Sequence, residues 1–281
     1  MTKYRLLPAA DTAPADLHRA FAAAFADYVA GPFALSLEGW PVFLARQGVD
    51  LALSRAAVAE GKVLAFAFTA PRTDVAAWRL AGMGALPAAR GSGAARDLLD
   101  DFVERARGAQ CTWAELECFA QNERALRLYA GRGFEALHEL HGHGGRPQPA
   151  ACDACMQVDL RDAFGWIEAM SRRRGDLPLQ VTPTALRALP EPLQSWRCGQ
   201  AQAVVAAGTP GKLTVFSLLD DGSPSQTDAL ALVRHLAAAY PEATFGAPQL
   251  QRPDLGGEAL ARAGLARLPL HQVFMRKRLA T

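Results

Sequence analysis

Apolar residues in the first fifty positions recur at the spacing of a helix. The recurring positions are Leu17, Phe21, Phe25 and Tyr28. This spacing places them on one side of a helix, so residues 14–47 are predicted to be mainly helical. Gly31 and Pro32 interrupt the pattern, which resumes at residues 37–46, and the region therefore splits into two helical stretches.

The pattern then changes from helical spacing to short apolar runs that are typical of strands. These runs are residues 50–57, 62–69 and 78–86. Glu60 and Gly61 form a turn between the first two runs, and Pro87 ends the third. The spacing predicts three consecutive antiparallel strands.

The clearest amphipathic helix begins near Ala95 and ends near Gly108. Its apolar positions follow a period of three and four residues, with charged residues on the opposite side. A strand at 112–119, a second helix at 122–131 and strands at 134–141 and 156–160 follow, and Asn122 is the expected N-cap of the second helix.

The second half of the chain repeats the order of elements found in the first. The expected elements are a helix near 163–172, strands at 200–207 and 212–219, helices at 226–240 and 257–263, and a strand at 271–278. The same order of strands and helices in both halves indicates that the fold is duplicated within the chain. We expect a first domain at 1–160, a linker at 161–175 and a second domain at 176–281.

Composition narrows the class of protein. The chain has 281 residues, of which 50% are hydrophobic and 21% charged, so it belongs to neither the disordered nor the low-complexity class. A formal net charge of +2 gives no reason to expect a nucleic-acid partner. The sequence shows no apolar leader or membrane-spanning run, and five cysteines are an odd number. We therefore expect a cytoplasmic protein without a membrane partner.

The most specific motif is a glycine-containing turn, residues 87–96, between the third strand and the strong helix. Gly91 and Gly93 let the backbone approach a ligand, and the first N–H groups of the helix attract anions such as phosphate. No Gly-Lys-Ser/Thr follows, which excludes a Walker A loop, and Arg96 stands where a dinucleotide fingerprint needs glycine. The alternative is a tight connection without a ligand.

Several ordered motifs resemble the GNAT superfamily of acyl-CoA-dependent N-acyltransferases over roughly residues 5–160. They are Arg90-x-x-Gly93-x-Ala95, Leu116-Glu117, Asn122-x-x-Ala125-x-x-Leu128-Tyr129 and Gly133-Phe134. The resemblance implies a mixed α/β (α+β) fold, here two tandem GNAT-like domains, each with a mixed, mostly antiparallel sheet flanked by helices. It also implies acetyl-CoA as co-substrate.

The resemblance further implies which residues bind the coenzyme. They are Met83, Gly84 and Ala85 for the pantetheine arm, Arg90, Gly91, Ser92, Gly93, Ala94, Ala95 and Arg96 for the pyrophosphate, and Asn122 beyond the thioester. Ser92 departs from the family, which often has Lys or Arg there, and this change is expected to weaken phosphate binding modestly.

Acetyl transfer needs a neutral amine, a donor for the oxyanion and a proton for the departing thiolate. The resemblance implies Tyr129 as general acid and Glu117 as general base. Glu115 and Glu117 share one side of their strand, so Glu115 is a second candidate base, and water is a third. The alternatives are a packed tyrosine and solvated strand carboxylates. Aromatic residues at 25–43 either pack in the core or line the acceptor site.

No metal site is expected. His138, His141 and His143 precede Cys152 and Cys155, yet no second pair of ligands completes the set. The two cysteines lead into a strand, in which residues three apart face opposite sides.

The second half lacks the residues implied for chemistry. Asp220 and Asp221 stand at the place of the phosphate turn, Leu260 at that of Tyr129 and Pro253 at that of Asn122. We expect a degenerate copy that completes the acceptor site or replaces the second subunit of a dimer.

The expected function is transfer of an acetyl group to a small-molecule amine or a peptide N-terminus, by a monomer or a homodimer. The alternative is a non-catalytic, acyl-CoA-binding regulator or scaffold.

Overall fold

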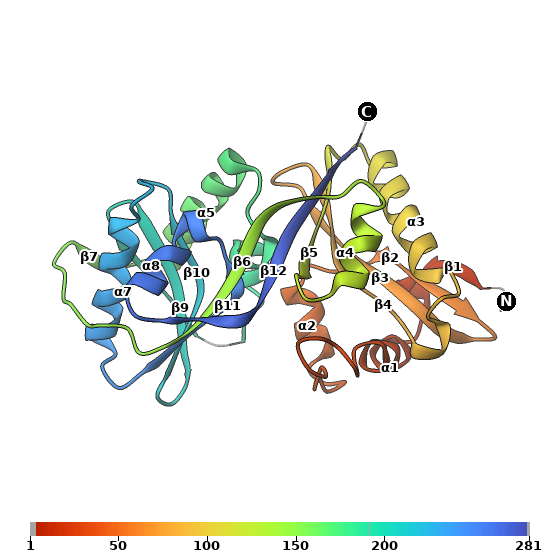
Figure 1. Ribbon diagram of the computed structural model, residues 1–281, viewed down its shortest axis with the longest axis horizontal. Helices are drawn as coiled ribbons and strands as arrows, with labels where there is room; N and C mark the ends of the chain where they lie inside the picture. The colour runs from red at the N-terminus through yellow and green to blue at the C-terminus, as the bar shows by residue number, and fades with distance from the viewer. Residues whose placement is uncertain (1–3, 191, 280–281) are drawn as a thin grey trace. The chain divides into compact units, whose positions relative to one another are not determined.

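A computed structural model describes residues 4–190 and 192–279 of the chain (Figure 1). The first three residues, which belong to the stretch considered for a leader, lie outside the described residues. The chain divides into two compact units. Unit 1 contains the residues up to Leu137 and those from Phe274 onward, and unit 2 is His138–Val273.

These units differ from the boundaries expected at residues 160 and 175. Two long strands, β6 (Glu135–Gly145) and β12 (Ala266–Arg278), each contribute residues to both units. The helix predicted near 163–172, within the expected linker at 161–175, is α5 (Leu160–Arg174), which Asp159 caps at its start and Gly175 ends in the left-handed conformation. The C-terminal residues return to unit 1 because β12 continues past Val273.

Unit 1 is built on a mixed sheet. Its elements are β1 (Arg5–Pro8), η1 (Ala9–Asp11), α1 (Pro14–Ala24), α2 (Trp40–Arg46), β2 (Asp50–Ala59), β3 (Lys62–Arg72), β4 (Ala77–Ala85), η2 (Pro87–Ala89), α3 (Ala94–Gly108), β5 (Trp113–Phe119), α4 (Glu123–Ala130) and parts of β6 and β12. The strand order is β1-β2-β3-β4-β5-β12. Neighbours from β1 to β4 are antiparallel, whereas β4 and β5 are parallel.

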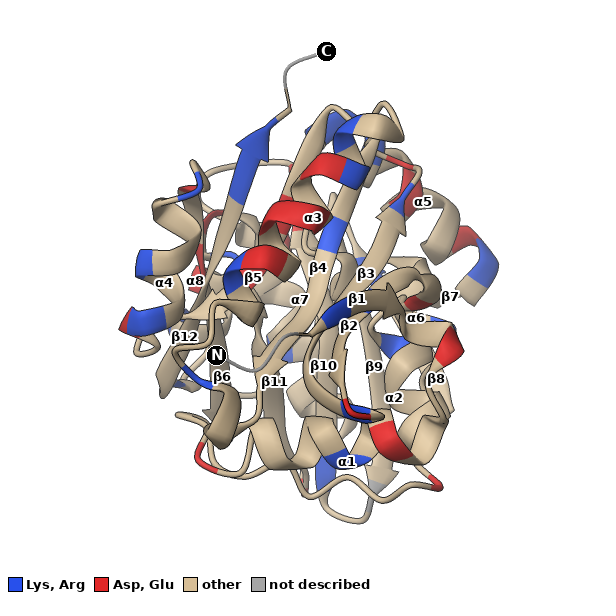
Figure 2. Cartoon of the chain, turned by 90° about the vertical axis from the view of Figure 1, so that its right-hand side faces the viewer, with Lys and Arg blue, Asp and Glu red and all other residues tan. Residues whose placement is uncertain are grey.

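Helices pack on this sheet through the sides that the sequence pattern predicted. Helix α1 buries Leu17 and Phe21 in a core that also holds Phe66 and Phe68 of β3. Helix α3 buries its apolar side and presents acidic and basic residues on the other, as Figure 2 shows. The helix predicted from Ala95 to Gly108 is confirmed. Of the region predicted as mainly helical at 14–47, only residues 14–24 and 40–46 are helical, so Phe25 and Tyr28 lie beyond the end of α1.

Unit 2 repeats this order of elements. They are β7 (Cys155–Val158), α5, η3 (Leu179–Val181), α6 (Pro183–Leu186), β8 (Leu193–Cys198), β9 (Ala201–Thr209), β10 (Lys212–Asp220), α7 (Thr227–Ala239), β11 (Thr244–Gln251), η4 (Pro253–Leu255), α8 (Gly257–Arg262) and parts of β6 and β12. The strand order is β12-β6-β11-β10-β9-β8-β7. Strands β10 and β11, which flank α7 in the sequence, are parallel, as β4 and β5 are in unit 1. The other pairs with a described register in unit 2 are antiparallel.

The predicted mixed α/β class, with mostly antiparallel sheets, is confirmed. The sequence pattern missed β1, β8 and β11. Within the described residues, no helix has the length and apolar character needed to cross a bilayer.

Candidate functional site

Strands β4 and β5 part from one another after a short parallel pairing. Their described register runs from Ala77 and Trp113 to Leu80 and Leu116 and ends there. Beyond that point β4 still pairs with β3 on its other side, and residues 81–85 are half-buried. The end of β4 therefore presents backbone N–H and C=O groups to a ligand on the side that β5 has left.

A bulge and a glycine shape this end of β4. The register with β3 shifts between the Phe68–Gly82 and Thr69–Leu80 pairs, which leaves Ala81 as the extra residue where the strands part. At Gly84, a Cβ atom would lie 2.9 Å from Ala24 Cβ and 2.9 Å from Phe66 Cζ, so only glycine lets α1 pack this closely. Met83, Gly84 and Ala85 thus lie together on the unpaired side predicted for the pantetheine arm.

The glycine-containing turn leads directly into α3. Gly91 and Gly93 have φ angles of +85° and +95°, the left-handed region that favours glycine. The N-cap residue of α3 is Gly93, which has no side chain to accept from the helix, and the Ala94 N–H donates to Ser92 Oγ at 3.3 Å. A Cβ on Gly91 would meet nothing within 4 Å, so the turn is open on that side. The helix N-terminus thus offers N–H groups and a partial positive charge to an anion.

Arg90 anchors this turn to the end of α1. Its guanidinium donates to both carboxylate oxygens of Asp27, at 2.5 and 2.6 Å, and to the backbone oxygen of Ala24 at 3.4 Å. The predicted coenzyme residue therefore has a structural partner, which holds the turn beside β4. Arg96 is exposed on the first turn of α3.

Helix α4 follows the end of β5 and carries two predicted site residues. Asn122 is its N-cap, as expected, and Asn122 Oδ1 accepts from the Ala125 N–H at 3.3 Å. Tyr129 lies two turns later and is 7% exposed, with its ring centroid 6.1 Å from that of Phe134.

The buried Tyr129 and Cys118 and the half-buried Tyr28 affect one another near the end of β5. Burial raises the pKa of Tyr129 well above its usual range, and the neighbouring Cys118 and Tyr28 add to the rise. Burial also raises the pKa of Tyr28 to about 12, together with Cys118, while a hydrogen bond with the Asn122 side chain opposes the rise. Tyr129 therefore stays protonated at neutral pH, which is the state that a proton donor needs.

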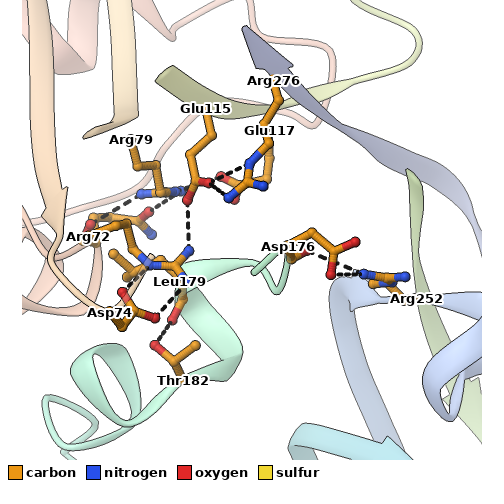
Figure 3. Close-up of polar contacts among 11 residues, drawn as sticks. Arg72, Asp74, Arg79, Glu115, Glu117, Asp176, Leu179, Thr182, Arg252 and Arg276 are labelled. Carbon is orange, nitrogen blue, oxygen red and sulfur yellow. Dashed lines mark hydrogen bonds and ion pairs between the residues drawn. The ribbon is translucent and has the colours of Figure 1, made fainter. Parts of the chain in front are cut away.

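The two carboxylates of β5 lie in an arginine network (Figure 3). Arg72 donates to Glu115 Oε1 at 2.7 Å, and Arg276 donates to Glu115 Oε2 at 2.9 Å. Arg79 Nε donates to Glu117 Oε2 at 2.7 Å. Both glutamates share one side of β5, as predicted, but they are ion-paired rather than solvated.

The charged side chains of this network are almost completely buried, so each charge has lost its hydration and depends on its ion-pair partner. The side chains of Glu115 and Glu117 are 0% and 1% exposed, and those of Arg72 and Arg79 are 2% and 3% exposed. Burial raises the pKa of Glu115, and Arg72 and Arg276 offset part of that rise. Within unit 1 the network therefore holds β4, β5 and the end of β12 in register where β4 and β5 part.

In unit 2 the equivalent strands β10 and β11 also part, and a side-chain carboxylate lies at the N-terminus of the following helix. The β10–β11 register also ends early, after Thr214 and Gly246. The carboxylate of Asp220, which is 2% exposed, accepts from the Ala229 N–H of α7 and from the Gly222 N–H, both at 3.0 Å. A carboxylate of the chain itself thus takes the position in which an anion would bind the N-terminus of α7.

The cysteines of unit 2 differ from the sequence interpretation. Cys152 precedes β7, and the Cys155 N–H donates to the Cys152 backbone oxygen at 3.0 Å in a turn. The reasoning that strand alternation separates the two side chains is therefore wrong. The sulfur atoms of Cys152, Cys155 and Cys198 all lie within 4.8 Å of one another.

Sequence reasoning named the end of β4, the turn, Asn122, Tyr129 and Glu117, all of which lie in unit 1. It missed the partners of these residues. Arg72, Arg79 and Arg276 come from distant parts of the chain, and no motif links them to the two glutamates. An arginine in the middle of an apolar strand is a usable signal, since a buried charge needs a partner.

Comparison with known proteins finds a family model that matches part of unit 1. Residues 17–134 match the model of the acetyltransferase (GNAT) family. None of the curated proteins matches the chain.

Solved structures share the fold of the whole chain. A GCN5-related N-acetyltransferase from Sphaerobacter thermophilus is 18% identical, with a TM-score of 0.66 over 99% of this chain and 96% of that one. A GCN5-related N-acetyltransferase from Anabaena variabilis is 13% identical, with a TM-score of 0.67; the match covers 99% of this chain and 73% of that one. A tandem GNAT protein from the clavulanic acid biosynthesis pathway is 14% identical, with a TM-score of 0.60 over 100% and 99%. The predicted tandem fold is thereby confirmed.

Proposed function

We propose that unit 1, of which residues 17–134 match the model of the acetyltransferase (GNAT) family, transfers an acetyl group from acetyl-CoA to a primary amine. The observation that carries the proposal is the parting of β4 and β5 beside the N-terminus of α3, whose N-cap residue is glycine. An extended thioester arm fits the first feature, and a pyrophosphate fits the second.

Coenzyme binding is proposed to use backbone groups rather than side-chain charge. The turn from Gly91 to Arg96 receives the pyrophosphate, with the N–H groups of Ser92 and Ala94 already donating to the Ala89 oxygen at 3.2 Å and to Ser92 Oγ at 3.3 Å. The backbone of Met83, Gly84 and Ala85 pairs with the pantetheine arm. Arg90 contributes by holding the turn through Asp27, because its guanidinium is engaged by that carboxylate. Asn122 contacts the coenzyme beyond the thioester.

The transfer forms a C–N bond and breaks a C–S bond, while the amine loses one proton and the sulfur gains one. Tyr129 is proposed to donate the proton to sulfur, because burial keeps its phenol protonated.

Glu117 is proposed to accept the amine proton through a water molecule. It is the first residue of β5 beyond the pairing with β4, whereas Glu115 lies within that pairing, opposite Arg79. Glu115, with both oxygens bound by arginines, is assigned a structural role.

The acceptor is proposed to be an amine that carries an apolar group, on a small molecule or at a peptide N-terminus. The segment after α1 exposes large apolar side chains, including Val29 and Phe33 at 41% each and Leu37 at 49%. Phe33 also contacts the ring of Phe21 at a centroid distance of 5.2 Å, so the exposed side chains continue the apolar core.

Unit 2 is proposed to be non-catalytic. Asp220 fills the anion position of α7, and the buried Leu260 stands at the place of Tyr129. No metal takes part in the proposed transfer, which a monomer or a homodimer carries out.

The test is titration of the full chain with acetyl-CoA by calorimetry, followed by a thiol-release assay over a library of amines. Tyr129→Phe is expected to lower kcat by roughly 10²-fold or more while changing the Kd of acetyl-CoA only a few-fold. Tyr240→Phe is the matched control, since Tyr240 lies in unit 2 and its hydroxyl donates to Gln194 at 2.5 Å.

Three outcomes separate the possibilities. Heat with ATP or NAD but none with acetyl-CoA contradicts the proposal. Heat with acetyl-CoA and no turnover on any amine supports the non-catalytic regulator or scaffold instead. For Glu117→Gln, loss of the acidic limb of the kcat–pH profile supports the base, whereas lower stability with an unchanged kcat indicates a structural carboxylate.

A further inference from the structure

Three of the five cysteines gather in unit 2 and have no part in the proposed transfer. Cys155 of β7 and Cys198 of β8 are directly opposed in the antiparallel register. Cys152 joins them from the preceding loop, and the three sulfur atoms lie within 4.8 Å of one another. Cys111 and Cys118, the other two, belong to unit 1.

The spacing of the sulfur atoms suits a shared cation. A tetrahedral zinc ion with Zn–S bonds of about 2.3 Å requires sulfur atoms roughly 3.8 Å apart. A disulfide requires about 2.05 Å, and all five cysteines are free. The three thiols are therefore arranged at the spacing of ligands, and small side-chain rotations bring them to a common centre.

The loop that carries Cys152 is fixed by its backbone. The Gln148 N–H donates to the Ala263 oxygen at 2.8 Å, and the Ala150 N–H donates to the Arg234 oxygen at 3.0 Å. The Cys152 N–H donates to His235 Nδ1 at 3.2 Å. Alternate residues of the loop are thus anchored to α7 and to the residue after α8, so the cysteine is held in place before any ligand binds.

The Cys-x-x-Cys turn holds two of the three thiols together. The Cys155 N–H donates to the Cys152 backbone oxygen at 3.0 Å, which closes the turn. The turn therefore brings the Cys152 and Cys155 sulfur atoms to within 4.8 Å of one another and of Cys198.

We propose that Cys152, Cys155 and Cys198 form a site for a soft transition-metal cation of the Zn²⁺ class. Thiolate ligands select such cations over Mg²⁺ or Ca²⁺, which prefer oxygen. His235 is an outer partner, because its Nδ1 accepts the Cys152 N–H. Cys155 and Cys198 are buried and Cys152 is half-buried, so the fourth position faces solvent on the Cys152 side and takes water.

The site joins the loop to the sheet of unit 2. Cys152 and Trp196 pack on the core that Cys155 and Cys198 help to form. A bound cation cross-links this loop to β7 and β8, so binding is expected to stabilise unit 2, and the stabilisation is expected to grow with the logarithm of the free metal concentration above the Kd.

The experiment uses the reduced full chain, freed of metal with a chelator and titrated with Co²⁺ and then Zn²⁺. We expect one Co²⁺ per chain, with a thiolate charge-transfer band and the ligand-field bands of tetrahedral Co²⁺, and displacement by Zn²⁺. Zn²⁺ is also expected to raise the thermal midpoint. Cys152→Ser, the least buried of the three positions, is expected to weaken binding by roughly 100-fold or more, because loss of an outer partner alone costs about 10–100-fold.

Cys111→Ser is the control, since Cys111 is a buried thiol of unit 1. It is expected to leave the metal affinity unchanged, and Cys198→Ser provides a second ligand variant. The proposal is overturned if the reduced chain binds no stoichiometric metal, or if Cys111→Ser weakens binding as much as Cys152→Ser. It is also overturned if the thiols instead form a disulfide under mild oxidation and the reduced chain shows no tetrahedral Co²⁺ spectrum.

Discussion

Neutralising Glu115 is expected to destabilise unit 1 strongly. The carboxylate is fully buried and binds Arg72 through one oxygen and Arg276 through the other. Glu115→Gln keeps the shape and some hydrogen bonds of the side chain, but leaves two buried guanidinium groups without this countercharge. Arg276 comes from β12 near the end of the chain, so the substitution also weakens the link between that strand and β5.

The magnitude follows from the partners that remain. Breaking a buried ion pair from one side costs about 3–5 kcal/mol. Arg72 keeps two hydrogen bonds to Asp74, each of 2.9 Å, and Arg276 keeps the face of Trp113 at 4.9 Å. These contacts place the expected loss near the lower limit, about 3 kcal/mol. With a urea m-value of about 2–3 kcal/mol/M, the midpoint of unit 1 falls by roughly 1 M.

The assay is urea unfolding followed by circular dichroism, with hydrogen exchange of the β5 and β12 peptides to assign the loss to unit 1. Glu123→Gln is the control, because Glu123 pairs with Arg127 while the two side chains are 77% and 72% exposed. Such a surface pair contributes little. If Glu115→Gln lowers the midpoint no further than Glu123→Gln, the view that the network holds unit 1 together is incorrect.

Four further outcomes follow from the structure. Gly84→Ala places a Cβ 2.9 Å from atoms of α1 and β3 and is expected to cost about 1–3 kcal/mol in urea unfolding; no loss means that the contact is absent. Gly93→Ala forces a φ of +95° on an L-residue and is expected to raise the Kd of acetyl-CoA, measured by calorimetry against Gly108→Ala. Burial, with Arg267 and His141, lowers the pKa of His143 to about 4, so below pH 6.5 the unfolded chain binds a proton that the folded chain does not. Stability then falls by about 2 kcal/mol from pH 7.5 to 5, and His143→Gln should flatten this slope. A fragment ending at residue 160 lacks β12 and is expected to melt below the full chain; an unchanged melting temperature contradicts the shared-strand arrangement.

Local pattern was enough for most elements of this fold. The predicted helix near 95–108 and the strands at 62–69 and 212–219 match α3, β3 and β10 within a few residues. Each has a strong apolar period, and burial of the apolar side determines the element.

The missed strands lack that signal. Strand β1 has four residues, and β11 reads TFGAPQLQ, which contains both glycine and proline. Strand β8 follows a proline-rich stretch and has only one β-branched or aromatic residue, Trp196. These segments become strands because neighbouring strands pair with them, which the sequence of one segment does not reveal.

The turn and the helix cap of the candidate site could be predicted from the sequence, whereas the ion pairs of its carboxylates could not. The residue types predict a turn at Gly91 and Gly93 and a helix cap at Asn122. The structure has both. The pairing of Glu117 with Arg79 joins residues 38 apart, so the carboxylate's surroundings depend on the parallel register of β4 and β5.

Strand β12 gives a physical reason why a second half without the expected site residues is retained. Its first residues belong to unit 2, and its last residues supply Phe274, which is fully buried, and Arg276 to unit 1. Unit 1 therefore obtains a core side chain and a countercharge for Glu115 only when the chain has passed through all of unit 2. Asp220 meanwhile satisfies the N-terminus of α7, so unit 2 folds without an anion. Unit 2 therefore needs no bound anion at α7 for its own stability, whereas removal of unit 2 and of the strand that leaves it also removes part of unit 1.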